Sequence, residues 1–225
     1  MPELTLPIAV SNSHVHLSAE DARAVLNVGS GLVYDSDARA EYEECLLKAR
    51  FLAEPSFGLI ETMRRENGEY FLVERHLARL AASAARFGFC FDGAAILARL
   101  ARVARDLGAG LHRVRLELRR DGALRVQTSA VIPWPELLKL AVSPFRVQSS
   151  NPLLRHKTTR RALYDSEYER LAREQGADEA VFLNERGELA DGSRTTIFVE
   201  RSGLWFTPPL SSGALDGVLR RELIE

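Results

Sequence analysis

Lys157 lies in a stretch whose residue types could do covalent chemistry, the run Leu-Arg-His-Lys-Thr-Thr-Arg-Arg over 154–161. We expect a loop before it and a helix from about Thr158 to Gln175, which puts Lys157 at a junction where its side chain can enter a cleft. A lysine amine becomes a Schiff-base nucleophile when burial or nearby cations lower its pKa, and Arg160 and Arg161 are such cations. The alternative is a solvated lysine in a basic first turn.

Three further segments could complete a site around this lysine. Arg79 lies on an expected helix after a pair of strands, where its guanidinium fork could bind a phosphate. Asp191 follows Lys157 by 34 residues, and Gly217–Leu219 open a helix with free backbone N–H groups. A phosphate-bearing aldehyde cofactor needs such a set. It requires a lysine for the Schiff base, a carboxylate that keeps a pyridine nitrogen protonated, and donors for the phosphate.

The composition limits the classes of protein that this chain can belong to. The 225 residues are 46% hydrophobic and 27% charged, as in globular proteins, and a net charge of −1 gives no basic field for nucleic acid. No apolar run reaches the roughly 18 residues that span a membrane, and the start lacks the pattern of a signal peptide. Two cysteines form no disulfide framework. We therefore expect a cytoplasmic protein that binds a small-molecule substrate, and neither nucleic acid nor a membrane.

The order of expected elements suggests three parts: a leader over residues 1–53, an α/β subdomain over 57–135 and a C-terminal subdomain over 140–225. The expected helices cover 38–52, 75–87 and 93–107, each with an apolar face. The expected strands cover 57–64, 70–73, 111–120, 123–128, 178–183, 188–191, 195–200 and 204–206, with tight turns between several pairs.

Two motifs of the leader could bind metals. His14 and His16 alternate on one face of an extended segment, which resembles the opening motif of zinc-dependent phosphotransacylases over fewer than 20 residues. No further ligand cluster follows, so we expect no metal site and take both as surface histidines.

The second motif comprises Gly-Ser-Gly-Leu-Val-Tyr-Asp-Ser-Asp over 29–37 and Glu-Tyr-Glu-Glu-Cys-Leu-Leu-Lys over 41–48. It resembles the last segment of chorismate-using synthases, especially the aminase component of aminodeoxychorismate synthase. The resemblance implies that Glu41 and Glu44 are magnesium ligands. The rest of that pocket is absent, so we do not expect synthase activity.

From about Phe57 to the end, several short motifs, in the right order, resemble those of the class IV pyridoxal-phosphate enzymes. They are Leu-Ile-Glu-Thr-Met-Arg over 59–64, His-Leu-Ala-Arg-Leu-Ala-Ala-Ser over 76–83, Phe-Gly-Phe over 87–89 and His-Lys-Thr-Thr-Arg-Arg over 156–161. The lyase half of fused aminodeoxychorismate synthase–lyase proteins is most similar. The resemblance implies an α+β fold like that of D-amino acid aminotransferases, with an α/β N-terminal and a β-rich pseudo-barrel C-terminal subdomain. It also implies pyridoxal 5'-phosphate and a homodimer.

The same resemblance assigns roles to individual residues. Lys157 would be the catalytic lysine and proton shuttle. The residues implied to bind the cofactor are Arg79, Lys157, Asp191, Thr195, Thr196, Leu215, Gly217, Val218 and Leu219.

The chain departs from the family pattern at several positions. Asp191 replaces a longer Glu, Thr196 replaces the usual Asn, and Asp216 replaces a Pro and puts an anion beside the phosphate donors, which like-charge repulsion disfavours. About forty residues that usually follow Arg220 are missing by comparison.

Three functions agree with these features. The first is a lyase that converts 4-amino-4-deoxychorismate to 4-aminobenzoate and pyruvate, a step toward folate. The second is a class IV amino acid transaminase. The third is a non-catalytic, truncated remnant of a fusion protein. His112, Arg113 and Arg115 could face a carboxylated substrate, although one face of their strand could equally be exposed to solvent.

Overall fold

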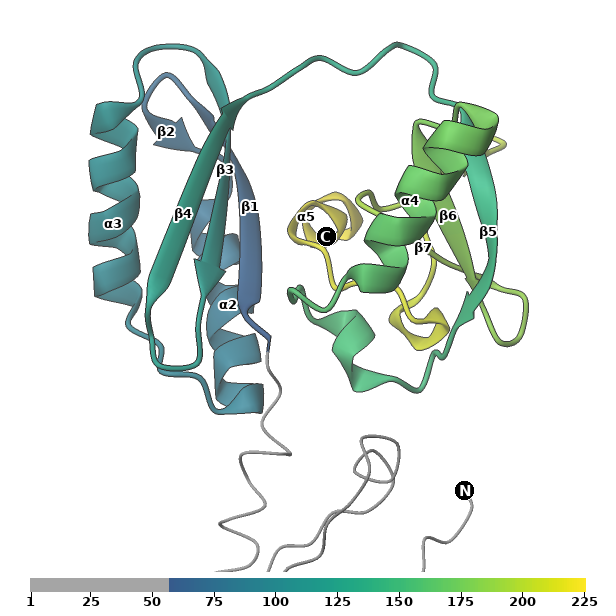
Figure 1. Cartoon of the computed structure of the whole chain (residues 1–225), viewed down its shortest axis with the longest axis horizontal. Coiled ribbons are helices and arrows are strands. Elements are labelled where there is room, and N and C mark those ends of the chain that lie inside the picture. Colours follow the sequence, from purple (N-terminus) through teal and green to yellow (C-terminus); the bar gives the residue numbers. More distant parts are fainter. Residues whose placement is uncertain (1–56) are drawn as a thin grey trace, which may run out of the picture. The chain divides into compact units, whose positions relative to one another are not determined.

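The computed structural model describes residues 57–225 (Figure 1). The leader expected over residues 1–53 lies outside the described residues, as do His14, His16, Glu41 and Glu44. The described part contains both helices and mostly antiparallel sheets, and the expected α+β class is confirmed.

The first half is a four-stranded antiparallel sheet in the order β2-β1-β3-β4. Its strands are β1 (Leu59–Glu66), β2 (Glu69–Tyr70), β3 (Leu111–Leu118) and β4 (Leu124–Ala130). Two helices, α2 (Val73–Phe87) and α3 (Gly93–Asp106), pack on one face of it. Alternate residues of β1 and β3 meet the apolar stripes of these helices in a buried core that includes Leu59, Leu80, Leu100 and Leu116.

The C-terminal end of α2 was predicted correctly from the sequence, but the residues before its start were not. Gly88 ends the helix in the left-handed conformation at φ 68°, as expected from a C-terminal glycine. The return strand expected over 70–73 was wrong beyond Tyr70. Leu72 adopts φ 54°, so the chain turns there and α2 begins at once.

The second half contains a three-stranded sheet in the order β5-β6-β7. Strand β5 (Leu140–Val147) pairs in parallel with β6 (Glu179–Asn184), and β7 (Leu189–Gly192) pairs antiparallel with β6. Helix α4 (Ala162–Gln175) makes the crossover between the parallel strands. Phe182 is fully buried beneath it and meets the Tyr164 ring at a centroid distance of 4.7 Å.

Shorter elements complete this half. They are two 3₁₀ turns, η2 (Pro152–Arg155) and η3 (Leu210–Ser212), the hairpin of β8 (Val199–Arg201) and β9 (Leu204–Phe206), and the final helix α5 (Val218–Ile224). The strand expected over 195–200 is therefore only partly correct, because residues 195–198 form an irregular turn.

The segment that carries Lys157 pairs with the start of β1. The Ile60 N–H donates to the Lys157 carbonyl at 2.8 Å, and the Thr159 N–H donates to the Gly58 carbonyl at 2.9 Å. The Gly58 N–H in turn donates to Thr159 Oγ1 at 2.9 Å. These bonds hold residues 157–159 extended. The expectation that the helix starts at about Thr158 was therefore wrong, and α4 begins at Ala162.

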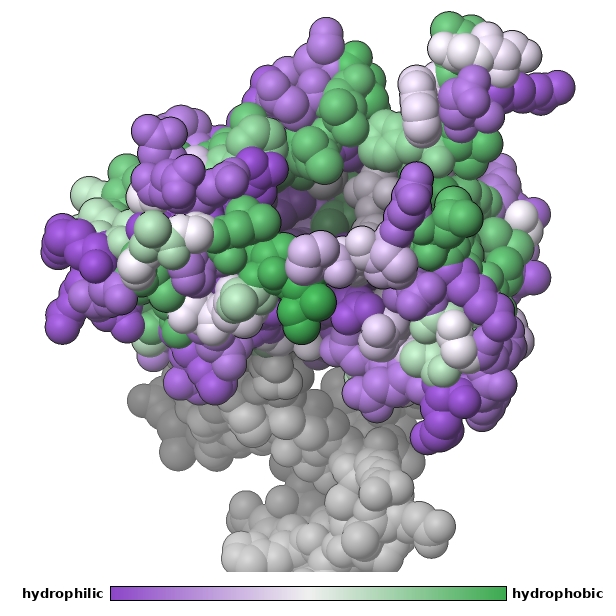
Figure 2. All heavy atoms as spheres, turned by 90° about the horizontal axis from the view of Figure 1, so that it is seen from above, coloured by the Kyte–Doolittle hydropathy of each residue, from purple (hydrophilic) through white to green (hydrophobic). Residues whose placement is uncertain are grey.

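Figure 2 shows one face of the molecule, on which apolar side chains form patches among hydrophilic ones around a hollow. Large apolar side chains are exposed on the β8–β9 hairpin and on α5, namely Val199, Leu204, Trp205, Phe206, Leu219, Leu223 and Ile224. Within residues 57–225, no helix is both long and apolar enough to cross a membrane.

Replacing Phe182 with alanine should lower the free energy of unfolding by about 3–5 kcal/mol, because it removes a fully buried ring and leaves a cavity under α4. Phe145 is a matched control, since its ring lies on β5 and is 53% exposed. Urea denaturation of both variants measures the difference. Equal shifts for Phe182→Ala and Phe145→Ala would contradict the packing described here.

Candidate active site

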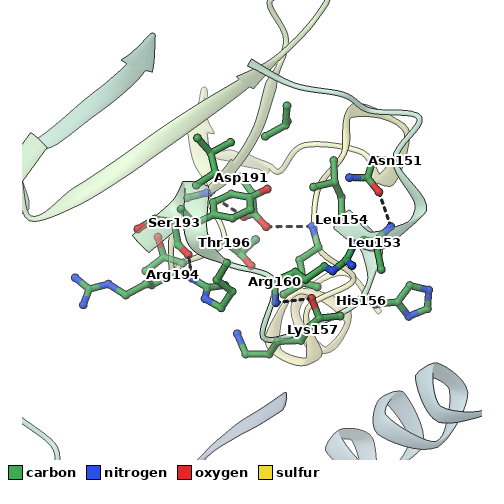
Figure 3. A pocket seen from close by; sticks show the side chains of 18 of the residues that line it. Asn151, Leu153, Leu154, His156, Lys157, Arg160, Asp191, Ser193, Arg194 and Thr196 are labelled. Carbon is green, nitrogen blue, oxygen red and sulfur yellow. Dashed lines mark hydrogen bonds between the residues drawn. The ribbon is translucent and has the colours of Figure 1, made fainter. Parts of the chain in front are cut away.

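A cavity of about 360 Å³ opens beside Lys157. Its walls come from the loop before α4, the first turn of α4, the end of β7 and the segment before α5. Figure 3 shows side chains from these segments around the cavity, with Lys157, Asp191 and Thr196 among them. Of the residues implied to bind a cofactor, the cavity is lined by Lys157, Asp191, Thr195, Thr196 and Leu215. The remaining ones, Arg79 and Gly217–Leu219, do not line it.

The Lys157 amine has an environment that favours its neutral form. Burial, followed by the positive charges of Arg161 and Arg79, lowers its pKa from 10.5 to about 8, although Glu61 and Asp191 act in the opposite direction. Roughly a tenth of this amine is therefore unprotonated at pH 7, far more than of an ordinary lysine, as a nucleophilic lysine requires. Of the two arginines predicted to act on Lys157, Arg161 is the one whose charge lowers its pKa. The Arg160 guanidinium lies over the Phe57 ring.

Asp191 is a buried carboxylate on the opposite wall. Its Oδ2 accepts from the Leu215 N–H and its Oδ1 from the Gly192 N–H, both at 3.0 Å. Burial raises the pKa of Asp191 to about 7 despite these bonds and the nearby Lys157. Lys157 and Asp191 thus both titrate close to neutral pH, and the pair can exchange protons with a bound molecule.

A second buried carboxylate, Glu179, shapes the turn that carries Thr195 and Thr196. It accepts from the hydroxyl of Ser193, from the Arg194 N–H at 3.2 Å and from Thr195 Oγ1 at 2.8 Å. Gly192 is needed in this turn, because a Cβ there would lie 2.6 Å from the Thr195 carbonyl oxygen. Glu179 was not predicted from the sequence, because nothing around it distinguishes it from an ordinary strand residue.

Thr196 connects the cavity to the start of α5. A Cβ placed on Gly217 would lie 3.2 Å from Thr196 Oγ1, so this hydroxyl is close to the N-terminus of α5. The first N–H groups of a helix have no partner within it, and α5 begins at Val218. Thr196, Gly217 and Val218 therefore lie in one small region, while the Leu219 side chain is exposed. Their role in binding phosphate stays a prediction.

Arg79 is buried, and its guanidinium nitrogens already donate to other groups of the protein. Nε donates to Glu61 Oε1 at 2.8 Å and Nη2 donates to Glu61 Oε2 at 2.5 Å. Nη1 donates to the Asp216 carbonyl at 3.2 Å, immediately before α5. Arg79 thus points toward the Thr196–Gly217 region through one nitrogen only. A phosphate contact by Arg79 would use Nη1.

The carboxylate of Asp216 does not stand alone beside this region. It forms a bidentate ion pair with Arg221, one turn along α5, and this pairing lowers the pKa of Asp216. The repulsion expected between Asp216 and a phosphate is therefore offset by the Arg221 guanidinium on α5.

Two aromatic contacts of the site were not anticipated from the sequence. Tyr164 lines the cavity, and burial raises the pKa of its phenol to about 12. Its position seven residues after Lys157 in the same stretch was the signal that could have found it. Arg194 also lines the cavity, with its guanidinium 3.6 Å from the centroid of the Tyr168 ring. Within residues 57–225, no group of His, Cys, Asp and Glu side chains could hold a metal ion.

Comparison with known proteins identifies the class. Residues 58–225 match the amino-transferase class IV family, and the chain belongs to that family. Residues 16–54 match the chorismate binding enzyme family. A Schizosaccharomyces pombe protein named "Putative aminodeoxychorismate lyase" is 31% identical over 169 residues, which are 71% of this chain and 70% of that protein.

Solved structures share the fold. The crystal structure of a "Putative amino-acid aminotransferase from Mesorhizobium loti" is 40% identical, with a TM-score of 0.70, over 75% of this chain and 83% of that one. A "Putative 4-amino-4-deoxychorismate lyase" is 28% identical, with a TM-score of 0.66, over 78% and 71% of the two chains. The expected class IV fold is confirmed, and enzymes of this family act on small molecules.

We predict that Lys157→Met raises the free energy of unfolding of the cofactor-free protein below pH 8, by up to about 3 kcal/mol. Burial disfavours the ammonium, so between pH 8 and 10.5 the unfolded chain holds a proton that the folded chain has released. The stability of the wild type therefore rises with pH in that window and approaches that of the variant. Denaturation at pH 7, 9 and 10.5 tests this. A pH-independent difference would contradict a lowered pKa.

Proposed function

We propose that this chain is a pyridoxal 5'-phosphate-dependent lyase that converts 4-amino-4-deoxychorismate to 4-aminobenzoate and pyruvate. The observation that carries the proposal is the Lys157 amine, whose pKa of about 8 lies well below that of an ordinary lysine, at a cavity that also contains a buried carboxylate. The similarity to proteins named aminodeoxychorismate lyase supports the choice of reaction. The match of residues 16–54 to chorismate binding enzymes agrees with a substrate derived from chorismate.

The chemistry of the donor set fits the proposed cofactor. An unprotonated amine is available at Lys157, and Asp191 is a buried acid with a pKa of about 7, suited to sharing a proton with a ring nitrogen. Thr196, the α5 N-terminus and Arg79 Nη1 supply donors of the kind that bind phosphate. When bound, pyridoxal phosphate supplies an electron sink for bond cleavage beside the substrate amine.

Each of the site residues of this chain would then have a separate role. Lys157 would hold and return protons at Nζ, which its lowered pKa allows near neutral pH. Asp191, oriented by the Leu215 and Gly192 N–H groups, would keep a proton at the ring nitrogen. Leu215 would pack against the ring, and Thr195 would stay in place through its bond to Glu179.

Three arginines suit a substrate with two carboxylates, such as 4-amino-4-deoxychorismate. Burial, followed by the charges of Arg115 and Arg194, lowers the pKa of Arg113, and Arg113 and Arg115 are alternate residues on one face of β3. Arg194 lines the cavity, and Arg113 and Arg115 lie on β3. A cluster of like charges is stabilised when an anion binds to it.

A second candidate is a class IV amino acid transaminase. It is favoured by the relative named as an amino-acid aminotransferase, which is 40% identical. It would use the same cofactor residues and differ only in the substrate. The homodimer implied by the sequence resemblance is part of either proposal.

The decisive test is turnover by the full chain loaded with pyridoxal phosphate. We expect 4-aminobenzoate, followed by its fluorescence, and an equal amount of pyruvate from 4-amino-4-deoxychorismate, with no product from a Lys157→Ala variant. Transfer of an amino group from an amino acid to a keto acid, without 4-aminobenzoate, would establish the transaminase instead. No turnover of either kind by folded, loaded protein would leave the non-catalytic remnant.

Arg221→Ala should weaken pyridoxal phosphate binding by about three- to fivefold, because it leaves the Asp216 carboxylate unpaired beside the phosphate. The double variant Asp216→Asn/Arg221→Ala should regain wild-type affinity. Absorption titration of the cofactor-free proteins measures both. If Arg221→Ala binds as tightly as wild type, Asp216 lies too far from the phosphate to matter.

A further inference from the structure

Glu61, His76 and Arg79 form a buried, hydrogen-bonded triad between β1 and α2. Glu61 lies on β1 and is 2% exposed, while His76 and Arg79 lie one turn apart on α2 and are 8% and 7% exposed. His76 Nδ1 lies 2.6 Å from Glu61 Oε2, the same oxygen that receives Arg79 Nη2. Burial acts to raise the pKa of Glu61, but the bonds from His76 and Arg79 outweigh it and lower the pKa. Glu61 is therefore an anion, and His76 Nδ1 is the donor to it.

The triad fixes the direction of one guanidinium nitrogen. Glu61 accepts hydrogen bonds from both Nε and Nη2 of Arg79. These two nitrogens would otherwise be free to bind a ligand carboxylate or phosphate with two bonds. Nη1 is left facing the backbone turn at Asp216, next to the α5 N-terminus. A free arginine side chain has many rotamers, and here the entropic cost of fixing one of them is met before any ligand arrives.

We infer that Glu61 and His76 are positioning residues that aim Arg79 Nη1 at the phosphate of the cofactor. This inference rests on the proposed function. Glu61 fixes Arg79 through two hydrogen bonds, and His76 fixes Glu61 through one. Both act through Arg79, because Arg79 and His76 occupy the two carboxylate oxygens of Glu61.

A purely structural ion pair would stabilise the fold without regard to phosphate, and this difference can be measured. Pyridoxal has the aldehyde of the cofactor but no phosphate, so it needs Lys157 and not Arg79. We would determine the affinities of the cofactor-free full chain for pyridoxal phosphate and for pyridoxal by absorption titration. Each variant's midpoint in urea would be measured alongside.

Glu61→Gln should weaken pyridoxal phosphate binding by about ten- to a hundredfold and change pyridoxal binding by less than about twofold. Glu66→Gln, a half-buried carboxylate at the end of the same strand that pairs with Arg64, is the matched control and should change neither. In an Arg79→Lys background, Glu61→Gln should cost nothing further, because its effect passes through Arg79. His76→Phe should give the same selective loss, smaller in size. It also provides a second variant if Glu61→Gln does not fold.

The outcomes separate this inference from the proposed function. Wild-type protein that binds neither compound would overturn the proposed function, and the inference with it. Wild-type protein that binds pyridoxal phosphate, with equal losses for both compounds in Glu61→Gln and His76→Phe, would leave the function standing and overturn the positioning role. Unchanged affinity in both variants would overturn the positioning role as well.

Discussion

The backbone pairing between β1 and residues 157–159 is the constraint on which the site depends. The bonds from Ile60 to Lys157 and from Thr159 to Gly58 join segments about a hundred residues apart in sequence. They make the Lys157 segment an added piece of strand and delay the start of α4 to Ala162. With its backbone fixed there, the Lys157 side chain is held at the cavity, and the adjacent strand places Glu61 near it. A buried amine with a lowered pKa follows from this placement.

Two carboxylates near the cavity are held in ion pairs with arginines. Glu61 is paired with Arg79, and Asp216 with Arg221. Lys157 and Asp191 have opposite charges when ionised, but burial moves both pKa values toward neutrality, to about 8 and about 7. The two groups that the proposal assigns to proton handling are thus the two whose ionisation is least costly to change near pH 7.5. The pairs around them supply fixed charge.

Much of the fold could be predicted from the sequence, because the patterns that mark its helices and turns involve only residues close together in the chain. The apolar stripe of α2, the glycine at its end and the turn at Asn67-Gly68 each depend on neighbouring residues. The start of α4 could not be predicted, because pairing with a distant strand overrode the helical pattern. The same holds for the site. Lys157 and Asp191 were found through residue type and resemblance, whereas Glu61 and Glu179 work through partners that only the folded chain brings to them.

The central claim is that Lys157, and no other amine of the chain, bonds covalently to pyridoxal phosphate. We would incubate the full chain with the cofactor, reduce it with borohydride and locate the added mass by peptide mass spectrometry. The account predicts stoichiometric modification on the peptide that contains Lys157. It also predicts no comparable modification of Lys48 or Lys139. Unmodified protein, or modification spread evenly over the three lysines, would contradict the account.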